Sequence, residues 1–383
     1  MTPALECRKV PEMVIGRDRL KVVHVYKDVY PVVGGIENFM RALCRELARQ
    51  PDLDIRMLVT SPDTTSTVAR LDGVQVIRAA RLATVASTPI SPRLALELRR
   101  LHPDIVHLHS PYPVGETAAL LATPATPTVI TFHSDVVRQK TLLKVYGPVL
   151  RRVLRHADRI LPTSPSYARS SPWLQAVRDR CTIVPLGIDL APFRTIANRG
   201  DGRTILFVGR FRYYKGLRYL LDALPLISDA RLVLVGGGPA EADLRAQAAA
   251  LGLAHRVTFA TGVSDRELPR FYAEADIFVL PACERSEAFG LVLVEALASG
   301  LPCVSTELQT GTSYVNKNGE TGLVVPPADP GALAAACRAL LADPALRARM
   351  GAAGRRRATR LFDITRVAAE VAAVYREVRH ARR

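Results

Sequence analysis

The stretch Ser286–Gly300 reads S-E-A-F-G-L-V-L-V-E-A-L-A-S-G and places two carboxylates, Glu287 and Glu295, around a glycine that opens an apolar helix. Strand-sized apolar runs lie on either side of it, at Ala275–Pro281 and Gly300–Thr306. The region therefore predicts one strand–helix–strand unit of a parallel sheet. The first N–H groups of a helix are unpaired and carry partial positive charge, so the loop before this helix is predicted to bind a phosphate-like anion.

Strands alternate with helices through both halves of the chain, and the alternation restarts after the polar break A-N-R-G-D-G at Ala197–Gly202. In the first half we predict strands at Lys21–Tyr26, Ile55–Thr60, Val74–Arg78, Asp104–His109, Thr128–His133 and Arg159–Ser164. In the second half we predict them at Ile205–Arg210, Arg231–Gly236, Val257–Ala260 and in the two runs around Ser286–Gly300. This pattern favours a doubly wound α/β sheet in each half, with ligand bound at the carboxyl ends of the strands.

The length of 383 residues also favours two domains. We predict an N-terminal extension over residues 1–19, a first Rossmann-like domain over 20–195 and a second over 196–360. Residues 361–383 are predicted to form a C-terminal helix.

Bulk composition narrows the class of protein. The net charge of +16 indicates an anionic partner, namely nucleic acid, a membrane surface or a phosphorylated ligand, unless it reflects only an Arg-rich genome. The apolar runs are too short for a transmembrane helix, and the N-terminus has no apolar signal core. The six cysteines are scattered without a C-x-x-C pair, which is typical of a reduced, cytosolic chain with buried thiols.

The segment Arg138–Arg159 concentrates positive charge against a single acid, Asp158, with apolar residues in between. Such a basic amphipathic segment can lie on anionic lipid, or it can be a helix packed on its own domain with a solvated face. The chain lacks an aromatic-interleaved stacking platform, so we expect no nucleic-acid partner. The basic residues are Arg138, Lys140, Lys144, Arg151, Arg152, Arg155 and Arg159.

Two polar features follow predicted strands of the first half. Gly34-Gly35 would let the backbone approach a ligand closely, although the pair also fits a plain strand-to-helix turn. His133, followed by Ser134-Asp135, suits hydrogen bonding to a sugar or phosphate. His107 and His109 are interpreted as structural. The chain carries no G-x-G-x-x-G after these strands, so a nicotinamide-binding fingerprint is not supported.

Arg210 and Lys215 follow the first strand of the second half, in G-R-F-R-Y-Y-K-G. Two cations beside a crevice could clamp a diphosphate and stabilise the charge of a leaving group, or they could belong to a solvated loop. Glu287 and Glu295 could form an acid–base pair. In a cationic setting they are expected to stay ionised, so accepting hydrogen bonds from sugar or ribose hydroxyls is the better interpretation.

Taken in order, these motifs resemble the retaining glycosyltransferases of family 4, which have the GT-B fold, and the resemblance covers nearly the whole chain. Its most specific element is the E-x7-E motif, which here runs from Glu287 to Glu295. The motifs that carry it are V-G-G-I-E (Val33–Glu37), F-H-S-D (Phe132–Asp135), V-P-L-G-I-D (Val184–Asp189), V-G-R-F-R-Y-Y-K-G (Val208–Gly216) and E-A-F-G-L-V-L-V-E-A (Glu287–Ala296).

The resemblance implies two Rossmann-like domains that face each other across a cleft, with the acceptor on the N-terminal side and a nucleotide-sugar donor on the C-terminal side. It also implies a last helix that crosses back to the N-terminal domain. Arg210 and Lys215 would hold the diphosphate, Glu295 the ribose and Glu287 the transferred sugar. Amides of Gly35, Phe289, Gly290 and Leu291 would contact phosphate or sugar, and His133 would lie near the sugar with Gly34 and Asp135 in the vicinity.

By the same resemblance, the enzyme would need neither a cofactor nor a metal, and attack would occur on the front face of the sugar. The acceptor would be a saccharide or a lipid-linked molecule, used in cell-surface polysaccharide or glycolipid synthesis. The enzyme would be cytoplasmic, at the inner face of the plasma membrane where its basic segment binds lipid. Two alternatives stay open: a sugar-nucleotide epimerase on the same fold, and a non-catalytic protein that binds nucleotide sugar or membrane.

One departure bears on the donor. The family commonly reads G-G-x-P-E after the strand that follows E-x7-E, whereas this chain reads T-E-L-Q-T-G-T-S-Y-V-N from Thr306. That version resembles a subset associated with mannosyl or rhamnosyl transfer in O-antigen-type synthesis. We therefore expect a GDP-sugar donor similar to GDP-mannose.

Overall fold

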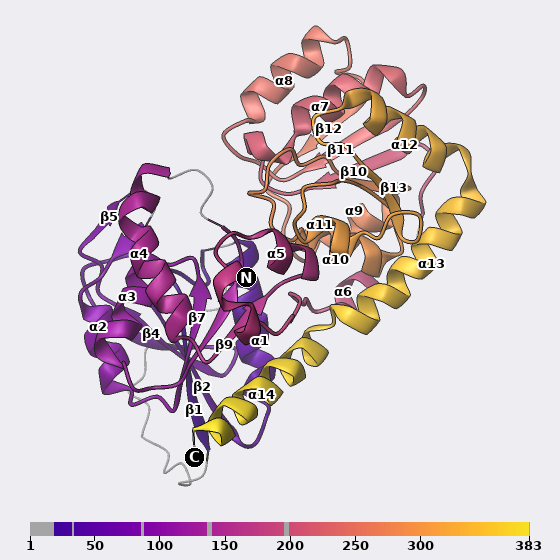
Figure 1. Ribbon diagram of the computed structural model, residues 1–383. Helices are drawn as coiled ribbons and strands as arrows, with labels where there is room; N and C mark the ends of the chain where they lie inside the picture. The colour runs from indigo at the N-terminus through magenta and orange to yellow at the C-terminus, as the bar shows by residue number, and fades with distance from the viewer. Residues whose placement is uncertain (1–18, 33, 86–87, 136–139, 195–198, 383) are drawn as a thin grey trace. The chain divides into compact units, whose positions relative to one another are not determined.

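The computed structural model describes residues 19–32, 34–85, 88–135, 140–194 and 199–382, without the side chains of 140–143 and 145. The chain divides into two compact units (Figure 1). The first contains the described residues up to 163, together with 171–185 and the C-terminal stretch from 364. The second contains 164–170 and 186–363, whereas the sequence placed the boundary at 195. All of the predicted N-terminal extension except Arg19, and with it Cys7, lies outside the described residues.

The first unit is built on a seven-stranded sheet in the order β3-β4-β2-β1-β7-β8-β9, parallel except for the β3–β4 hairpin. The direction of winding reverses between the neighbours β1 and β7, which is the position at which sheets of this kind commonly bind a ligand. The strands are β1 Leu20–Val25, β2 Leu53–Thr60, β3 Thr67–Leu71, β4 Val74–Ala79, β7 Ile105–Ser110, β8 Thr128–Phe132 and β9 Arg159–Pro162, with β5 Ala83–Val85 and β6 Thr88–Ile90 forming a separate hairpin.

The second unit repeats the architecture with six parallel strands in the order β12-β11-β10-β13-β14-β15. Here the winding reverses between β10 and β13, and the loops after both strands carry the residues that the sequence singled out. The strands are β10 Thr204–Val208, β11 Arg231–Val235, β12 Val257–Ala260, β13 Ile277–Leu280, β14 Cys303–Thr306 and β15 Gly322–Val325.

The helices follow local sequence rules. Asp329 and Asp343 each accept a hydrogen bond from the backbone N–H three residues later, and the proline after each opens the helix. In the first unit the helices are α1 Gly35–Leu47, α2 Arg93–Arg100, α3 Pro113–Ala122, α4 Lys140–His156 and α14 Ile364–Ala381. In the second they are α5 Pro165–Ser170, α6 Ala191–Arg194, α7 Leu217–Ala223, α8 Glu241–Ala250, α9 Leu268–Glu274, α10 Leu291–Ser299, α11 Thr312–Val315, α12 Pro330–Ala342 and α13 Pro344–Leu361.

The last two helices belong to different units. Helix α13 packs on α10, whereas α14 packs along α1 of the first sheet, so the chain returns to the unit in which it began (Figure 1). Val367, Val371 and Tyr375 repeat every four residues on α14 and are all buried. This is the spacing of an amphipathic helix that turns one face to a core.

Predicted and observed strands agree to within a few residues at each end. The predictions missed β3, β5, β6 and β15. The missed strand β3, T-V-A-R-L, is mostly exposed and pairs with β4 alone, so it has no apolar run to mark it. The thiols of Cys44, Cys303 and Cys337 are free and buried, and those of Cys181 and Cys283 are free and half-buried.

Glycine allows two loops of the second unit to meet. Gly216 has a φ of 70°, and a Cβ there would lie 1.9 Å from the carbonyl oxygen of Pro281, the residue after β13. The backbone N–H of Cys283 donates to the carbonyl of Tyr214 at 2.9 Å, which holds the same two loops together. The loop after β10 is therefore pressed against the loop after β13.

Gly216→Ala should destabilise the second unit more than the matched change Gly252→Ala. Gly252 also has positive φ, 68°, but a Cβ there would meet no atom within 4 Å. Gly252→Ala should cost about 1–2 kcal/mol for the left-handed backbone alone. Gly216→Ala should add about 1–3 kcal/mol for the forced contact. Urea unfolding of both variants measures the difference, and equal midpoints would contradict this account of the loop contact.

Candidate functional site

An ion pair lies where the loops after β10 and β13 meet. The Lys215 Nζ is 2.5 Å from Oε2 of Glu287, and both side chains are largely buried, 11% and 9% exposed. Burial by itself would lower the pKa of Lys215, but the charge of Glu287, with smaller contributions from Tyr214 and Glu295, raises that pKa overall. The ammonium is therefore a fixed positive charge at the carboxyl edge of the sheet.

The backbone around Glu287 is held by the segment that follows Thr306, in which the sequence departs from the common family pattern. Thr310 donates from its hydroxyl to the carbonyl of Glu287 at 2.9 Å, and the N–H of Gly311 donates to the carbonyl of Ala288 at 2.7 Å. Thr310 is fully buried, and a Cβ at Gly311 would lie 2.7 Å from the Phe289 ring. The T-G-T version of this segment thus orients the loop that presents Glu287.

Helix α10 begins directly after this loop. Gly290 precedes its first turn with left-handed φ and ψ of 80° and 64°. Phe289 is 3% exposed as a whole residue, and its ring packs edge-on against Phe362, so its side chain belongs to the core. Leu291 is the first residue of α10, so the unpaired N–H groups of the first turn follow the loop that carries Glu287. That they bind an anion stays a prediction.

Glu295 lies one turn into α10 and is half-buried. Its Oε2 accepts a hydrogen bond of 2.6 Å from the hydroxyl of Tyr272, on α9. Burial, reinforced by Asp265 and opposed by Tyr272 and Lys215, raises the pKa of Glu295 to about 7. The cationic setting was expected to keep this carboxylate ionised, but near neutral pH it is only partly ionised, because desolvation outweighs the attraction of Lys215. Sequence reasoning also missed Tyr272, which lies in no motif.

Arg210 is exposed, and among the described residues no hydrogen bond or ion pair engages its guanidinium. The loop that carries it packs against the glycines after β11: the N–H of Phe211 donates to the carbonyl of Gly237, and a Cβ at Gly236 would lie 2.1 Å from the carbonyl oxygen of Gly209. The three glycines Gly236–Gly238 thus serve close loop packing. Of the two cations that the sequence predicted for the site, Lys215 is therefore fixed by Glu287, whereas Arg210 is exposed on the same loop after β10.

In the first unit the candidate residues gather at the ends of β1 and β8. A Cβ at Gly34 would lie 2.3 Å from the carboxylate of Glu37, which is 7% exposed, so the missing side chain makes room for that acid. Gly35 is the exposed first residue of α1. Phe39 of α1 packs edge-on against the ring of His133 at 5.8 Å, which places His133 beside α1. Asp135 is half-buried and accepts a 2.6 Å hydrogen bond from Ser171.

His133 is 2% exposed and belongs to a buried histidine cluster that the sequence analysis did not anticipate. His24 and His107 are adjacent in β1 and β7, and His109 bonds to both His24 and His133. Burial lowers the pKa of each of the four, that of His109 to about 3. The sequence did contain a sign of the cluster, because His107 and His109 form an H-x-H pattern on one face of β7. Their partners became identifiable only once the structure placed β1 and β8 on either side of that strand.

Three of these residues, His24, His107 and His109, bring ligand atoms within 4.8 Å of one another, the spacing of a candidate metal group. Their ring nitrogens, however, already hydrogen-bond to each other and to Tyr375. A metal would have to displace those bonds, since it binds through the same lone pairs. That no metal is needed stays a prediction.

Helix α4 forms most of the basic segment, and Arg159 at the end of that segment is the first residue of β9. Lys144, Arg151, Arg152 and Arg155 are exposed, whereas Leu150, Val153 and Leu154 are buried, which fits a helix packed on its own unit with a charged outer face. The Arg151 guanidinium lies 5.5 Å from the Trp173 ring. The side chains of Arg138 and Lys140 lie outside the described ones. In the described part of the chain, no helix combines the length and apolar character that a membrane span requires.

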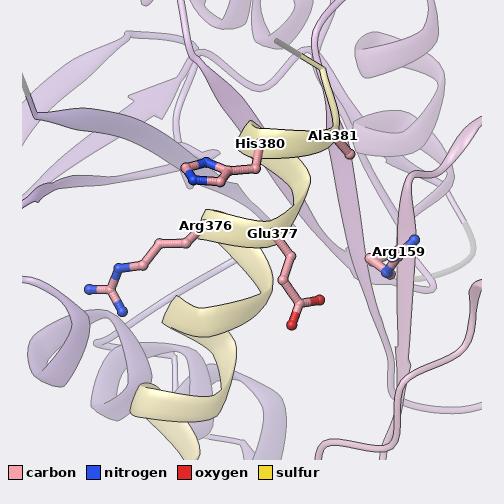
Figure 2. Close-up of a pocket in the computed structure, with 5 residues that line it drawn as sticks. All are labelled: Arg159, Arg376, Glu377, His380 and Ala381. Atoms are coloured by element: carbon pink, nitrogen blue, oxygen red, sulfur yellow. The ribbon is translucent and has the colours of Figure 1, made fainter.

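A shallow hollow along α14 is lined by Arg159, Arg376, Glu377, His380 and Ala381. Figure 2 shows Arg376 and His380 extending from one side of the helix and Glu377 from the other. The guanidinium of Arg376 makes two 2.9 Å hydrogen bonds to Asp52. These side chains do not converge on a common point, so the hollow is not a candidate site.

Two family models match the chain, one in each half. The family described as Glycosyltransferase Family 4 matches residues 33–192, and the one described as Glycosyl transferases group 1 matches 192–357. D-rhamnosyltransferase WbpZ of Pseudomonas aeruginosa is 38% identical over 90% of this chain and 92% of its own length. O-antigen chain mannosyltransferase C of Escherichia coli is 36% identical over 90% and 94%. Phosphatidyl-myo-inositol mannosyltransferase of Mycobacterium leprae is 31% identical over 91% and 94%.

Solved structures support the fold. Sucrose-phosphate synthase from Thermosynechococcus elongatus superposes with a TM-score of 0.79 at 24% identity, over 95% of this chain and all of that one. Anabaena Alr3699/HepE in complex with UDP and glucose gives 0.75 at 19%, over 94% and 100%. The prediction of two Rossmann-like domains of the GT-B class is confirmed. With both family matches and relatives above 30% identity over nine-tenths of its length, the chain belongs to the group 1 and family 4 glycosyltransferases and is an enzyme of that class.

Proposed function

We propose that the protein is a retaining glycosyltransferase that moves a hexosyl group from a GDP-mannose-like donor to a saccharide or lipid-linked acceptor in cell-surface polysaccharide or glycolipid synthesis. The observation that carries this proposal is the convergence of Lys215, Glu287 and Glu295 at the start of α10. A diphosphate needs positive charge and free N–H groups, and a sugar nucleotide also needs hydroxyl acceptors. One edge of the second sheet supplies all three.

In this proposal Lys215 and Arg210 hold the diphosphate, and the amides of Gly290 and Leu291 add hydrogen bonds from the helix start. Lys215 is already fixed by Glu287, so it would stabilise the developing charge on the leaving diphosphate without having to reorganise. Arg210 is exposed and can adjust to the outer phosphate. The amide of Phe289 is a further contact, since its ring is committed to the core.

The two carboxylates would take different partners. Glu295, on α10 and bonded to Tyr272, would accept hydrogen bonds from the ribose hydroxyls. Glu287, on the loop before α10, would accept them from the transferred sugar. Attack on the front face of the sugar would make an enzymic nucleophile unnecessary, and neither carboxylate is then required as an acid or a base.

In the first unit His133 would take part at the transferred sugar, with Gly34, Gly35 and Asp135 nearby in that unit. The choice of donor and acceptor in this proposal follows the names of the relatives. Two of them are a D-rhamnosyltransferase and an O-antigen chain mannosyltransferase, and a relative of 28% identity from Mycolicibacterium smegmatis is a GDP-mannose-dependent mannosyltransferase. The experiment that tests the proposal is a donor screen followed by analysis of the product anomer. A product with inverted configuration, or no transfer from any nucleotide sugar, would contradict it.

Lys215→Ala should reduce kcat about 100-fold or more with GDP-mannose, because the departing diphosphate loses its fixed charge. The matched control is Lys317→Ala. Lys317 also pairs with a glutamate, Glu320, at 2.6 Å, but both side chains are exposed. Steady-state kinetics of both variants, with circular dichroism to check folding, makes the comparison. Full activity in Lys215→Ala would remove Lys215 from the site.

The affinity for GDP should rise with pH through the pKa of Glu295, about 7. Ribose hydroxyls are held by the ionised carboxylate, so the Kd should fall about tenfold between pH 6 and pH 8. The stability of the fold should change with pH in the opposite direction. Folding raises the pKa of Glu295, so the contribution of this group to the free energy of unfolding is present at low pH and is lost as pH rises through 7. Calorimetric titration should show the slope in the wild type and in Glu274→Gln, an exposed glutamate paired with Arg270. A slope that survives in Glu295→Gln would argue against this role.

We also propose that α4 rests on an anionic membrane surface, where a lipid-linked acceptor would be found. Its exposed cations are joined by Arg180, whose Nη1 donates to the carbonyls of Arg155 and Ala157. Trp173 lines a hollow with Arg151 and Arg155, a pairing of aromatic and cationic side chains suited to the lipid interface.

Vesicles of phosphatidylglycerol and phosphatidylcholine should retain the protein in a flotation assay at low salt and release it at high salt. Replacing Arg151, Arg152 and Arg155 together with glutamine should abolish flotation. The control replaces Arg245, Arg270 and Arg366, which are exposed cations on other helices. Equal loss in both triple variants would indicate a general charge effect, and no flotation of the wild type would remove the proposal.

A further inference from the structure

Six buried side chains in the first unit form one continuous hydrogen-bonded chain that ends at His133. They come from β1, β7, β8, the residue after β8, and α14, so the chain crosses the sheet and ties it to the C-terminal helix. None is more than 3% exposed. In order, the members are Thr131, His107, Tyr375, His24, His109 and His133, joined at 2.7, 2.5, 3.1, 3.0 and 3.0 Å.

The number of hydrogens limits how the chain can be arranged. Burial lowers the pKa of all four histidines, so each ring is neutral and carries a single N–H. With the two hydroxyls, the six members supply six hydrogens for five hydrogen bonds. Each ring uses both nitrogens along the chain except His133, whose Nδ1 is buried without a partner among the described residues. The sixth hydrogen therefore lies either at an end of the chain or on Tyr375, whose hydroxyl oxygen can accept from both of its neighbours.

Three arrangements satisfy all five bonds. In the first, Thr131 donates to Nε2 of His107, every later member donates toward His133, and His133 carries its N–H on Nδ1. In the second, every bond is reversed: His133 donates from Nε2 to His109, its Nδ1 is a bare acceptor, and His107 donates to Thr131. In the third, the bonds from His133 to Tyr375 run as in the second, but Thr131 donates to His107 and Tyr375 accepts from both His107 and His24. The N–H on Nδ1 of His133 is thus compatible only with the first arrangement.

The three arrangements differ in what they leave unpaired. The first leaves one group, the Nδ1–H of His133. The second leaves two, the bare Nδ1 of His133 and the hydroxyl hydrogen of Thr131, which has no other acceptor among the described residues. The third also leaves two, the bare Nδ1 of His133 and the hydroxyl hydrogen of Tyr375. An unpaired polar group in a buried site carries a free-energy penalty, so the first arrangement is favoured.

We propose that Thr131 and Tyr375 are positioning residues, which act through His107, His24 and His109 to hold His133 as the tautomer with its N–H on Nδ1. In that form His133 is a hydrogen-bond donor for an oxygen of the sugar or phosphate at the end of β8. The link to glycosyl transfer rests on the role of His133 in the proposed function, whereas the tautomer itself does not.

The tautomer can be read directly by NMR of protein labelled with ¹⁵N in the histidine rings, with the His133 signals assigned by their loss in His133→Asn. The wild type should show His133 protonated on Nδ1. Protonation on Nε2 in the wild type would overturn the inference. So would one tightly bound metal ion per chain in elemental analysis of the purified protein, because metal bonds would replace the hydrogen bonds.

Thr131→Val and Thr131→Ser form a matched pair. Valine has the shape of threonine but no hydroxyl, so the first two arrangements would each leave two groups unpaired and the third would leave three. The Nδ1–H form of His133 should therefore fall from nearly all toward about half of the molecules. Serine restores the hydroxyl and should restore the wild-type spectrum. Tyr375→Phe cuts the chain between His107 and His24 and should act like valine. An unchanged His133 signal in both Thr131→Val and Tyr375→Phe would overturn the inference.

Kinetics separates this inference from the proposed function. In Thr131→Val, kcat should fall about twofold or more, in proportion to the lost tautomer, with an unchanged KM for the donor. A wild type that shows the Nδ1–H form but transfers no sugar would refute the proposed function and leave the tautomer assignment standing. A shifted tautomer with unchanged kcat would overturn the proposed link between His133 and transfer.

Discussion

The ion pair between Lys215 and Glu287 joins the loops that follow β10 and β13, the neighbouring strands at which the second sheet reverses its winding. A buried ion pair adds little net stability, because desolvation of the charges offsets their attraction. The main effect of this ion pair is to position its two charged groups. The pair fixes a cation and a carboxylate beside the start of α10, and the contact at Gly216 together with Thr310 holds the two loops that present them.

The surrounding residues extend this arrangement. Tyr272 orients Glu295, and the burial that raises the pKa of Glu295 comes from the same packing that brings α9 against α10. Charge, helix start and hydroxyl acceptor therefore lie on one edge because parallel strands direct the loops after them to the same side.

The first unit has polar side chains in the core of its sheet. Its central strands place histidines where aliphatic residues would be expected, and each must find a partner because an unpaired buried polar group is unfavourable. The partners are one another, together with Thr131 and Tyr375. A tyrosine from α14 closes the chain between β1 and β7, so the return of the C-terminal helix to this unit also completes its polar core.

Local pattern alone determined the alternation of strands and helices, the two Rossmann-like halves, and the loops in which Lys215, Glu287 and Glu295 lie, because strand burial and helix starts are encoded within short windows of sequence. The exposed hairpin strand β3 and the short β15 carried too weak a pattern to be predicted. Tertiary structure alone decided the partners: Lys215 with Glu287, Tyr272 with Glu295, and Tyr375 with two histidines far away in sequence. It also decided the pKa of Glu295, since desolvation depends on which atoms surround a group, and that is set only when distant segments pack together.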